Sequence, residues 1–140
     1  MRPCLFAILI GIATCTADAR AQSALIGFQS PSHNIHCQFE TGDTQNVVRC
    51  DVMEGAVTAP RPRDCDLEWG RAFEISNRRG RPGERICYGD TVMDPKLPVL
   101  AYGATWQHSG FICTSEQTGV TCFNADRHGF SLSRAQQTMF

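Results

Sequence analysis

Two stretches of the chain alternate between apolar and polar residues, and a polar turn interrupts each of them. The first consists of alternating residues 35–39, a polar turn at 41–45 and alternating residues 48–52. The second occupies residues 110–130 and has its turn at 115–119. Successive side chains of a β-strand point to opposite faces, so this pattern predicts two hairpins, each with one face turned inward.

Each predicted hairpin carries one cysteine on each of its strands. Cys37 and Cys50 flank the first turn, and Cys113 and Cys122 flank the second. Neighbouring antiparallel strands bring facing Cα atoms to about 5.5 Å, a separation that suits a disulfide. We therefore predict one disulfide within each hairpin.

Glycine and proline cut the rest of the chain into short segments. Residues 67–75 predict two short strands with a bend, and 85–91 and 99–103 predict two more, the last of them buried. The tail at 133–138 predicts a single helical turn capped by Ser133. Short strands separated by turns, without a long amphipathic helix, predict an all-β fold: a small antiparallel sandwich or barrel of short hairpins stapled by three disulfides.

The first 21 residues have the composition of a secretory signal peptide. Arg2 is followed by an apolar run from Cys4 to Ala13, and small residues precede Gln22. A membrane span needs about 20 apolar residues, so a run of this length predicts a cleaved signal rather than an anchor. Cleavage is expected after Ala19 or Ala21, and the second position is favoured.

A cysteine within this leader offers a different processing route. Residues 12–15, Ile-Ala-Thr-Cys, have the outline of a lipid-attachment site that ends in Cys15. The residue before such a cysteine is usually Gly, Ala or Ser, and here it is Thr14. Simple export is therefore the main expectation, and a lipid anchor on Cys15 is the alternative.

Export predicts that the cysteines of the remaining domain, residues 22–140, are oxidised. Their number is even and no C-x-x-C pair occurs, which favours a disulfide framework over a metal site. The two hairpin pairs leave Cys65 and Cys87 to bridge the middle of the chain. The predicted disulfide residues are Cys37, Cys50, Cys65, Cys87, Cys113 and Cys122.

The charge of residues 22–140 is close to neutral. Without Arg2 and Arg20 the 13 basic residues become 11, and without Asp18 the 14 acidic residues become 13. Nothing in this balance supports binding to nucleic acid. The basic turn at 76–83 predicts a solvated loop, with an anion-binding tip as the alternative.

Short motifs stand in a fixed order along the chain. They are Phe28-x-Ser30-Pro31-Ser32-x-Asn34-Ile35-x-Cys37, Val48-Arg49-Cys50-Asp51, Trp69-Gly70, Cys87-x-Gly89-Asp90-Thr91, Tyr102-Gly103, Phe111-x-Cys113, Gly119-Val120-Thr121-Cys122-x-Asn124 and His128-Gly129-Phe130-x-Leu132-Ser133-Arg134. Together they resemble a family of small exported bacterial domains of unknown function, DUF6636. The resemblance implies export and cysteine pairing, and it transfers no active site. The family pattern has Gly before Asn34, where this chain has His33, so an altered turn is expected there.

Candidate chemistry is sparse. His33, His36, His108 and His128 do not have the spacing of a helical metal site, so no metal-binding residue is predicted. His128 is expected to bond a neighbouring backbone group before the turn at Gly129. The alternative is a small secreted hydrolase that uses His128 with a nearby Asp or Ser. No catalytic or cofactor-binding residue and no cofactor are predicted.

The four rings with polar edges that remain as candidates for binding are Trp69, Tyr88, Tyr102 and Trp106. Trp69 is expected to be buried, whereas Tyr88 and Trp106, if exposed together, would form a platform for a sugar or a peptide. The sequence thus predicts a secreted or periplasmic binding module without a membrane span, whose partner is an envelope protein or a glycan. A protease-inhibitor-like scaffold that presents the loop at 76–85 is the remaining alternative.

Overall fold

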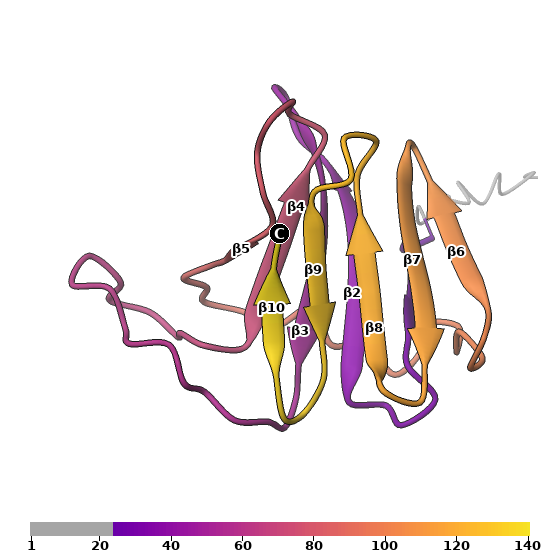
Figure 1. Ribbon diagram of the computed structural model, residues 1–140, viewed down its shortest axis with the longest axis horizontal. Helices are drawn as coiled ribbons and strands as arrows, with labels where there is room; N and C mark the ends of the chain where they lie inside the picture. Colours follow the sequence, from indigo (N-terminus) through magenta and orange to yellow (C-terminus); the bar gives the residue numbers. More distant parts are fainter. Residues whose placement is uncertain (1–23) are drawn as a thin grey trace, which may run out of the picture.

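Two five-stranded antiparallel sheets pack face to face in the computed structural model (Figure 1). The structure describes residues 24–140, so the predicted signal peptide and the lipid site lie outside the described residues. Both sheets are open, which identifies the fold as a β-sandwich and confirms the predicted all-β class. Within the described residues there is no helix with the length and hydropathy that crossing a membrane requires.

Each sheet is a meander in which every strand pairs with its neighbour in the chain. The first sheet contains β1 (Gly27–Gln29), β2 (Ile35–Thr41), β3 (Asn46–Val52), β4 (Ala72–Ser76) and β5 (Glu84–Arg85). The second contains β6 (Thr105–His108), β7 (Phe111–Glu116), β8 (Gly119–Phe123), β9 (Gly129–Leu132) and β10 (Gln137–Met139). Residues 86–104 form the connection between the two sheets. The predicted hairpins are β2–β3 and β7–β8.

The two sheets present matching rows of side chains to the core. In strand order, the row on the first sheet is Phe28, Cys37, Cys50 and Phe73, and the row on the second is Trp106, Cys113, Cys122 and Phe130. Each row therefore has two cysteines between two aromatic rings. Except for the partly buried Trp106, these side chains are at most 1% exposed.

Three disulfides join Cys37 to Cys50, Cys65 to Cys87 and Cys113 to Cys122. The first and third connect directly opposite residues of a hairpin and lie inside the sandwich. The second lies outside the two sheets and ties the segment after β3 to the segment after β5. The disulfides therefore serve both the core and the long connections.

The connection between the sheets folds over the outer face of the first sheet, and Asp51 holds it there. This carboxylate is 1% exposed and accepts hydrogen bonds from the Arg49 guanidinium at 3.0 and 3.1 Å. It also accepts from the Thr91 hydroxyl at 2.9 Å and from the Val92 backbone N–H at 3.0 Å. Charge-assisted bonds of this kind are the strong ones, so a buried acid on β3 fixes the position of residues 91–92.

Residues 99–103 do not form the predicted buried strand. Val99 and Tyr102 are 50% and 47% exposed, and Val99 makes an isolated bridge to Gln29. Pro98 has no N–H to donate to a ladder, and Gly103 has a φ of +83°, which ends extended structure. The apolar run therefore belongs to the connection over the sheet, and the strand of this region is β6.

The tail does not form the predicted helical turn. The Ser133 hydroxyl accepts a hydrogen bond from the Gln136 N–H at 3.0 Å, so this serine does organise a turn. The chain then continues as β10, and Gln137 pairs with Leu132 of β9. The edge of β9 that β8 does not cover has unpaired backbone N–H and C=O groups. By pairing with them as β10, these residues make more backbone hydrogen bonds than they would in one helical turn.

Two other predicted strands are shorter than expected. Of the pair predicted at 67–75, β4 forms, whereas Glu68 makes a single bridge to Tyr88. The strand predicted at 85–91 is reduced to β5. Trp69, which was expected to be buried, is partly exposed, and its indole N–H donates to the Ala59 carbonyl at 3.2 Å.

Candidate functional site

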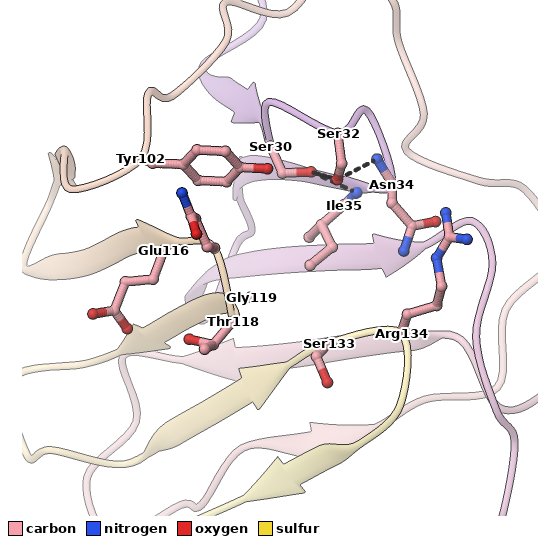
Figure 2. A pocket seen from close by; sticks show the side chains of 11 residues that line it. Ser30, Ser32, Asn34, Ile35, Tyr102, Glu116, Thr118, Gly119, Ser133 and Arg134 are labelled. Atoms are coloured by element: carbon pink, nitrogen blue, oxygen red, sulfur yellow. Dashed lines mark hydrogen bonds between the residues drawn. The ribbon is translucent and has the colours of Figure 1, made fainter.

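A polar cleft of about 250 Å³ lies at one end of the sandwich, where several loops meet (Figure 2). The β1–β2 loop forms one side of it, and the β7–β8 and β9–β10 turns form the other. The lining residues are Ser30, Ser32, Asn34, Ile35, Tyr102, Glu116, Gln117, Thr118, Gly119, Ser133 and Arg134. The antiparallel meander brings these separate turns to the same edge.

Two serine hydroxyls shape the β1–β2 loop. The Ser30 and Ser32 hydroxyls lie 3.1 Å apart, and the Ile35 N–H donates to the Ser30 hydroxyl at 3.0 Å (Figure 2). His33 has a φ of +57°, in the left-handed region that glycine adopts most readily. An altered turn was expected here because His33 stands where the resemblance places glycine. The structure shows that His33 takes a backbone conformation that also suits glycine.

Asn34 connects the loop to the chain that follows β3. Its amide N–H donates to the Glu54 carbonyl at 2.9 Å, and its side-chain oxygen accepts from the Glu54 N–H at 2.8 Å. The residue is 7% exposed, and both ends of its amide are satisfied. Asn34 therefore holds the wall of the cleft in place rather than offering a free group to a ligand.

The groups free to meet a ligand stand on opposite sides of the cleft. Figure 2 shows the Tyr102 ring on one side and the Arg134 guanidinium on the other, with the serine hydroxyls between them. Arg134 is 3.2 Å from the Glu54 carboxylate, but these side chains are 64% and 72% exposed, so the pair is open to water. Glu116 adds a carboxylate next to the β7–β8 turn. Such a set suits a small ligand that carries hydroxyl or carboxylate groups.

Most of the cleft comes from the motifs that carry the family resemblance. Eight of its eleven lining residues lie within those motifs, and the exceptions are Glu116, Gln117 and Thr118. Several motif residues elsewhere are explained by the core, because Cys37, Phe130 and their neighbours are buried. The core does not explain the exposed Tyr102 and Arg134.

The four histidines are divided among separate places. His33 and His36 line a second cavity, on the outer face of the first sheet. The ring of His108 packs edge-on against Phe39, with centroids 4.3 Å apart. The backbone N–H of His128 donates to the Asn124 side chain at 3.1 Å, and no Asp or Ser side chain of residues 24–140 is hydrogen-bonded to its ring. The structure thus adds no support for a hydrolase built on His128.

The predicted aromatic platform does not form. Trp106 is partly buried against the core and packs on Phe28, with ring centroids 5.6 Å apart. Tyr88 lies on the connection outside the first sheet, and the Arg49 guanidinium is 5.2 Å from its ring centroid. The exposed ring is instead Tyr102, which sequence reasoning had placed in a buried strand. Gly103 is the sequence signal that could have predicted the exposure of Tyr102, since glycine next to an aromatic residue is also typical of a turn.

Three groups outside the cleft have shifted pKa values. Burial raises the pKa of Glu74, and the nearby Glu84 and Glu40 raise it further. Burial, together with Asp51 and Glu68, raises the pKa of the Tyr88 hydroxyl. Burial lowers the pKa of Arg85, whose guanidinium lies 4.8 Å from the Phe73 ring centroid.

Comparison with known proteins supplies a family and no activity. No curated protein and no solved structure shows significant similarity to the chain. The model of a family of unknown function, DUF6636, matches residues 4–140. The match covers nearly all of the 140 residues. The chain therefore belongs to the DUF6636 family.

Proposed function

We propose that this protein is an exported binding module of the cell envelope or the extracellular space, and that the polar cleft holds its ligand. The observation that carries the proposal is the convergence of polar side chains from four separate segments on one cleft that includes the exposed Tyr102 and Arg134. Exposed polar and aromatic residues that the core does not need favour a role in binding.

The chemistry of the cleft favours one saccharide unit of an envelope glycan. An exposed tyrosine ring offers an apolar face with a hydroxyl at its edge, which suits the mixed surface of a sugar ring. The Arg134 guanidinium and the Glu116 carboxylate provide a donor and an acceptor for hydroxyl, amide or carboxylate groups. A volume of about 250 Å³ is below the range of about 300–1,000 Å³ usual for drug-sized ligands, so the ligand part that enters is small.

The cleft is better suited to binding than to catalysis. A serine nucleophile needs a neighbouring base, and no histidine lines the cleft. The Ser30 hydroxyl already accepts a hydrogen bond from the Ile35 N–H and meets the Ser32 hydroxyl, so it serves the loop. The three disulfides support an oxidising compartment, and the leader sequence supports export.

The test is an NMR titration of ¹⁵N-labelled protein, residues 22–140 with the disulfides intact, against N,N′-diacetylchitobiose and a soluble peptidoglycan fragment. We expect amide shifts confined to residues 30–35, 102–103, 116–119 and 133–134. Tyr102→Ala and Arg134→Ala should each weaken binding at least tenfold. Arg81→Ala, which removes an exposed arginine far along the chain from the cleft residues, serves as the matched control.

Two results would count against the proposal. One is the absence of shifts at millimolar concentrations of both saccharides. The other is a set of shifts that persists unchanged in Tyr102→Ala and Arg134→Ala, since this would place the saccharide elsewhere on the surface. Shifts in the cleft on addition of an envelope protein, without any response to saccharide, would redirect the assignment from a glycan to a protein partner.

A further inference from the structure

A second cavity, of about 560 Å³, lies on the outer face of the first sheet. Its lining residues are Gln29, His33, His36, Met53, Met93 and Pro95. They come from three segments: the β1–β2 region, the end of β3 and the connection between the sheets. Two of the four histidines and two of the three methionines of residues 24–140 are thus gathered around one cavity.

His36 holds a buried ring nitrogen without a partner. The residue is 3% exposed, and its Nε2 lies 3.1 Å from the backbone carbonyl oxygen of His33. A carbonyl oxygen only accepts, so Nε2 carries the proton and Nδ1 carries the lone pair. Nδ1 is buried and has no hydrogen-bond partner among the described residues. Buried polar atoms are nearly always satisfied, so this lone pair requires an explanation.

His33 is oriented by a comparable hydrogen bond. Its Nδ1 lies 2.7 Å from Oε1 of Gln29, whose amide nitrogen donates to the carbonyls of Pro95 and Leu97 at 3.1 and 2.6 Å. Because the amide oxygen of Gln29 can only accept, Nδ1 of His33 donates and its Nε2 keeps the lone pair. Histidines that bind metals are held in this way, with one nitrogen donating to an oxygen and the other directed at the metal.

The backbone of His33 supports a role for its side chain. Its φ of +57° lies in the left-handed region, which a non-glycine residue adopts at an energetic cost. A histidine in a conformation that glycine adopts more easily is consistent with a use for its imidazole, since strained residues concentrate at functional sites.

The donor set around the cavity is soft. None of the six lining residues carries a carboxylate or a thiol, and carboxylate oxygens are what magnesium, calcium and manganese prefer. Thioether sulfur combined with imidazole is instead suited to copper(I). All six cysteines of residues 24–140 are in disulfides, so the methionines supply the soft sulfur that remains.

We propose that this cavity binds one copper(I) ion through Nδ1 of His36, Nε2 of His33 and the sulfur atoms of Met53 and Met93. Gln29 acts as a positioning residue, because its amide fixes the proton on His33. The site is independent of the proposed glycan function. Along the β1–β2 loop and the start of β2, the cleft residues Ser30 and Asn34 alternate with His33 and His36, and the two sets line different hollows.

The first experiment measures copper(I) affinity by competition with bicinchoninate under anaerobic conditions, with ascorbate as the reductant and the disulfides checked by mass spectrometry. We expect one copper(I) per protein. Met93→Leu, at a 46% exposed position, and His33→Gly should each lower the affinity at least tenfold. Met139→Leu and His128→Ala remove the same donor types outside the cavity and should leave the affinity unchanged.

His33→Gly separates metal binding from folding. Glycine relieves the left-handed backbone at this position, which offsets the loss of the hydrogen bond to Gln29. The variant should therefore remain folded, with a urea midpoint close to that of the parent, while it loses copper. His36→Ala changes a buried residue and can fail to fold. His33→Gly still tests the ligand set in that case. Affinity that is unchanged in both Met93→Leu and His33→Gly would overturn the proposed ligand set.

A second readout uses silver(I), which resembles copper(I) but does not change oxidation state, and protein labelled with ¹³C at the methionine methyl groups. The resonances of Met53 and Met93 should shift at one equivalent, and that of Met139 should not. Equal shifts of all three methionines, or no shift below ten equivalents, would overturn the proposal. So would displacement of copper(I) by an equal concentration of zinc(II), because the thioethers would then contribute nothing.

Discussion

The sulfur atoms of Cys50 and Cys122 lie 3.9 Å apart across the interface between the two sheets. Each belongs to a disulfide that joins two strands of its own sheet. The two bridges therefore meet in the centre of the core, where they fill space that apolar side chains fill in other sandwiches. Their contribution to stability includes packing as well as the covalent link.

Removal of a core disulfide should cost more stability than removal of the outer one. Cys65 and Cys87 are separated by 22 positions and Cys113 and Cys122 by 9. The chain-entropy account favours the longer loop by only about 0.7 kcal/mol. Truncation of two buried side chains costs roughly 2 kcal/mol in lost burial and cavity formation. The urea midpoint of Cys113→Ala/Cys122→Ala should therefore be lower than that of Cys65→Ala/Cys87→Ala.

The reverse order of midpoints would show that the covalent constraint outweighs packing in this core. The comparison requires each variant to keep the other two disulfides, which non-reducing peptide mapping establishes. Cys87 is exposed whereas Cys65 is 5% exposed, so Cys65→Ala/Cys87→Ala truncates one buried side chain rather than two.

Gly129 should not tolerate a methyl group. A Cβ at this position would lie 1.8 Å from the Cys122 carbonyl oxygen and 2.8 Å from the Phe123 Cα, both of them backbone atoms of the adjacent strand. Gly129→Ala must therefore displace β8 from β9, at a cost of about 2–3 kcal/mol. Gly89→Ala is the control, since its Cβ would meet the Leu67 side chain at an ordinary 3.8 Å. Thermal unfolding that lowers the midpoint equally for both variants would contradict this account.

Asp51→Ala should be among the most damaging single replacements on the outer face of the first sheet. It leaves the Arg49 guanidinium and the Val92 N–H without their buried acceptor. Removal of one partner of a buried ion pair costs about 3–5 kcal/mol. Asp43→Ala, in an exposed turn, should change stability by less than about 0.5 kcal/mol. Hydrogen exchange should show the greatest loss of protection at residues 91–93, and uniform loss across both sheets would argue against a local anchoring role.

Glu74 should make the protein less stable as the pH rises. Its pKa is raised in the fold, first by burial and then by Glu84 and Glu40, so the folded state binds this proton more tightly than the unfolded state. The associated stability is present below the ordinary glutamate pKa of about 4.3 and is lost as the pH rises through the folded value. Glu74→Gln should therefore gain stability over the parent at pH 7 and little or none at pH 3.5.

The control for Glu74→Gln is Asp43→Asn, which also removes one negative charge but lies in an exposed turn. Urea midpoints measured from pH 3.5 to 7.5 give the comparison. A gain that is the same at every pH, or equal in the control, would show that net charge rather than the environment of Glu74 is responsible.

The hairpins could be predicted from the sequence because their signals are local. Alternation around residues 35–52 and 111–123 gives strands, and cysteines at facing positions fix which residues oppose one another. Residues 99–103 show the limit of such reasoning, since an apolar run looks the same in a buried strand and in a connection that packs over a sheet. What decides between them is Pro98 and the hydrogen bonds that Asp51 makes to residues 91 and 92.

The two candidate sites were beyond reach of the sequence pattern. Tyr102 and Arg134 are 32 positions apart and share a cleft only because the end of the inter-sheet connection and the β9–β10 turn lie at the same edge of the sandwich. Met93 reaches His33 and His36 through the docking of the connection on β3, which depends on Asp51, a buried acid that is distant from all three residues in the sequence. Contacts across such distances have no period in the chain, so composition and spacing do not reveal them.

The disulfide connectivity bears on how the chain matures. The cysteines of the described residues are bonded in consecutive pairs along the chain, as Cys37–Cys50, Cys65–Cys87 and Cys113–Cys122. Under the proposed export, the N-terminal half enters the oxidising compartment first, and the second thiol of each pair arrives when its correct partner is the one thiol still free. An oxidant that joins thiols in order of arrival then produces the native set directly, and maturation does not require an isomerase.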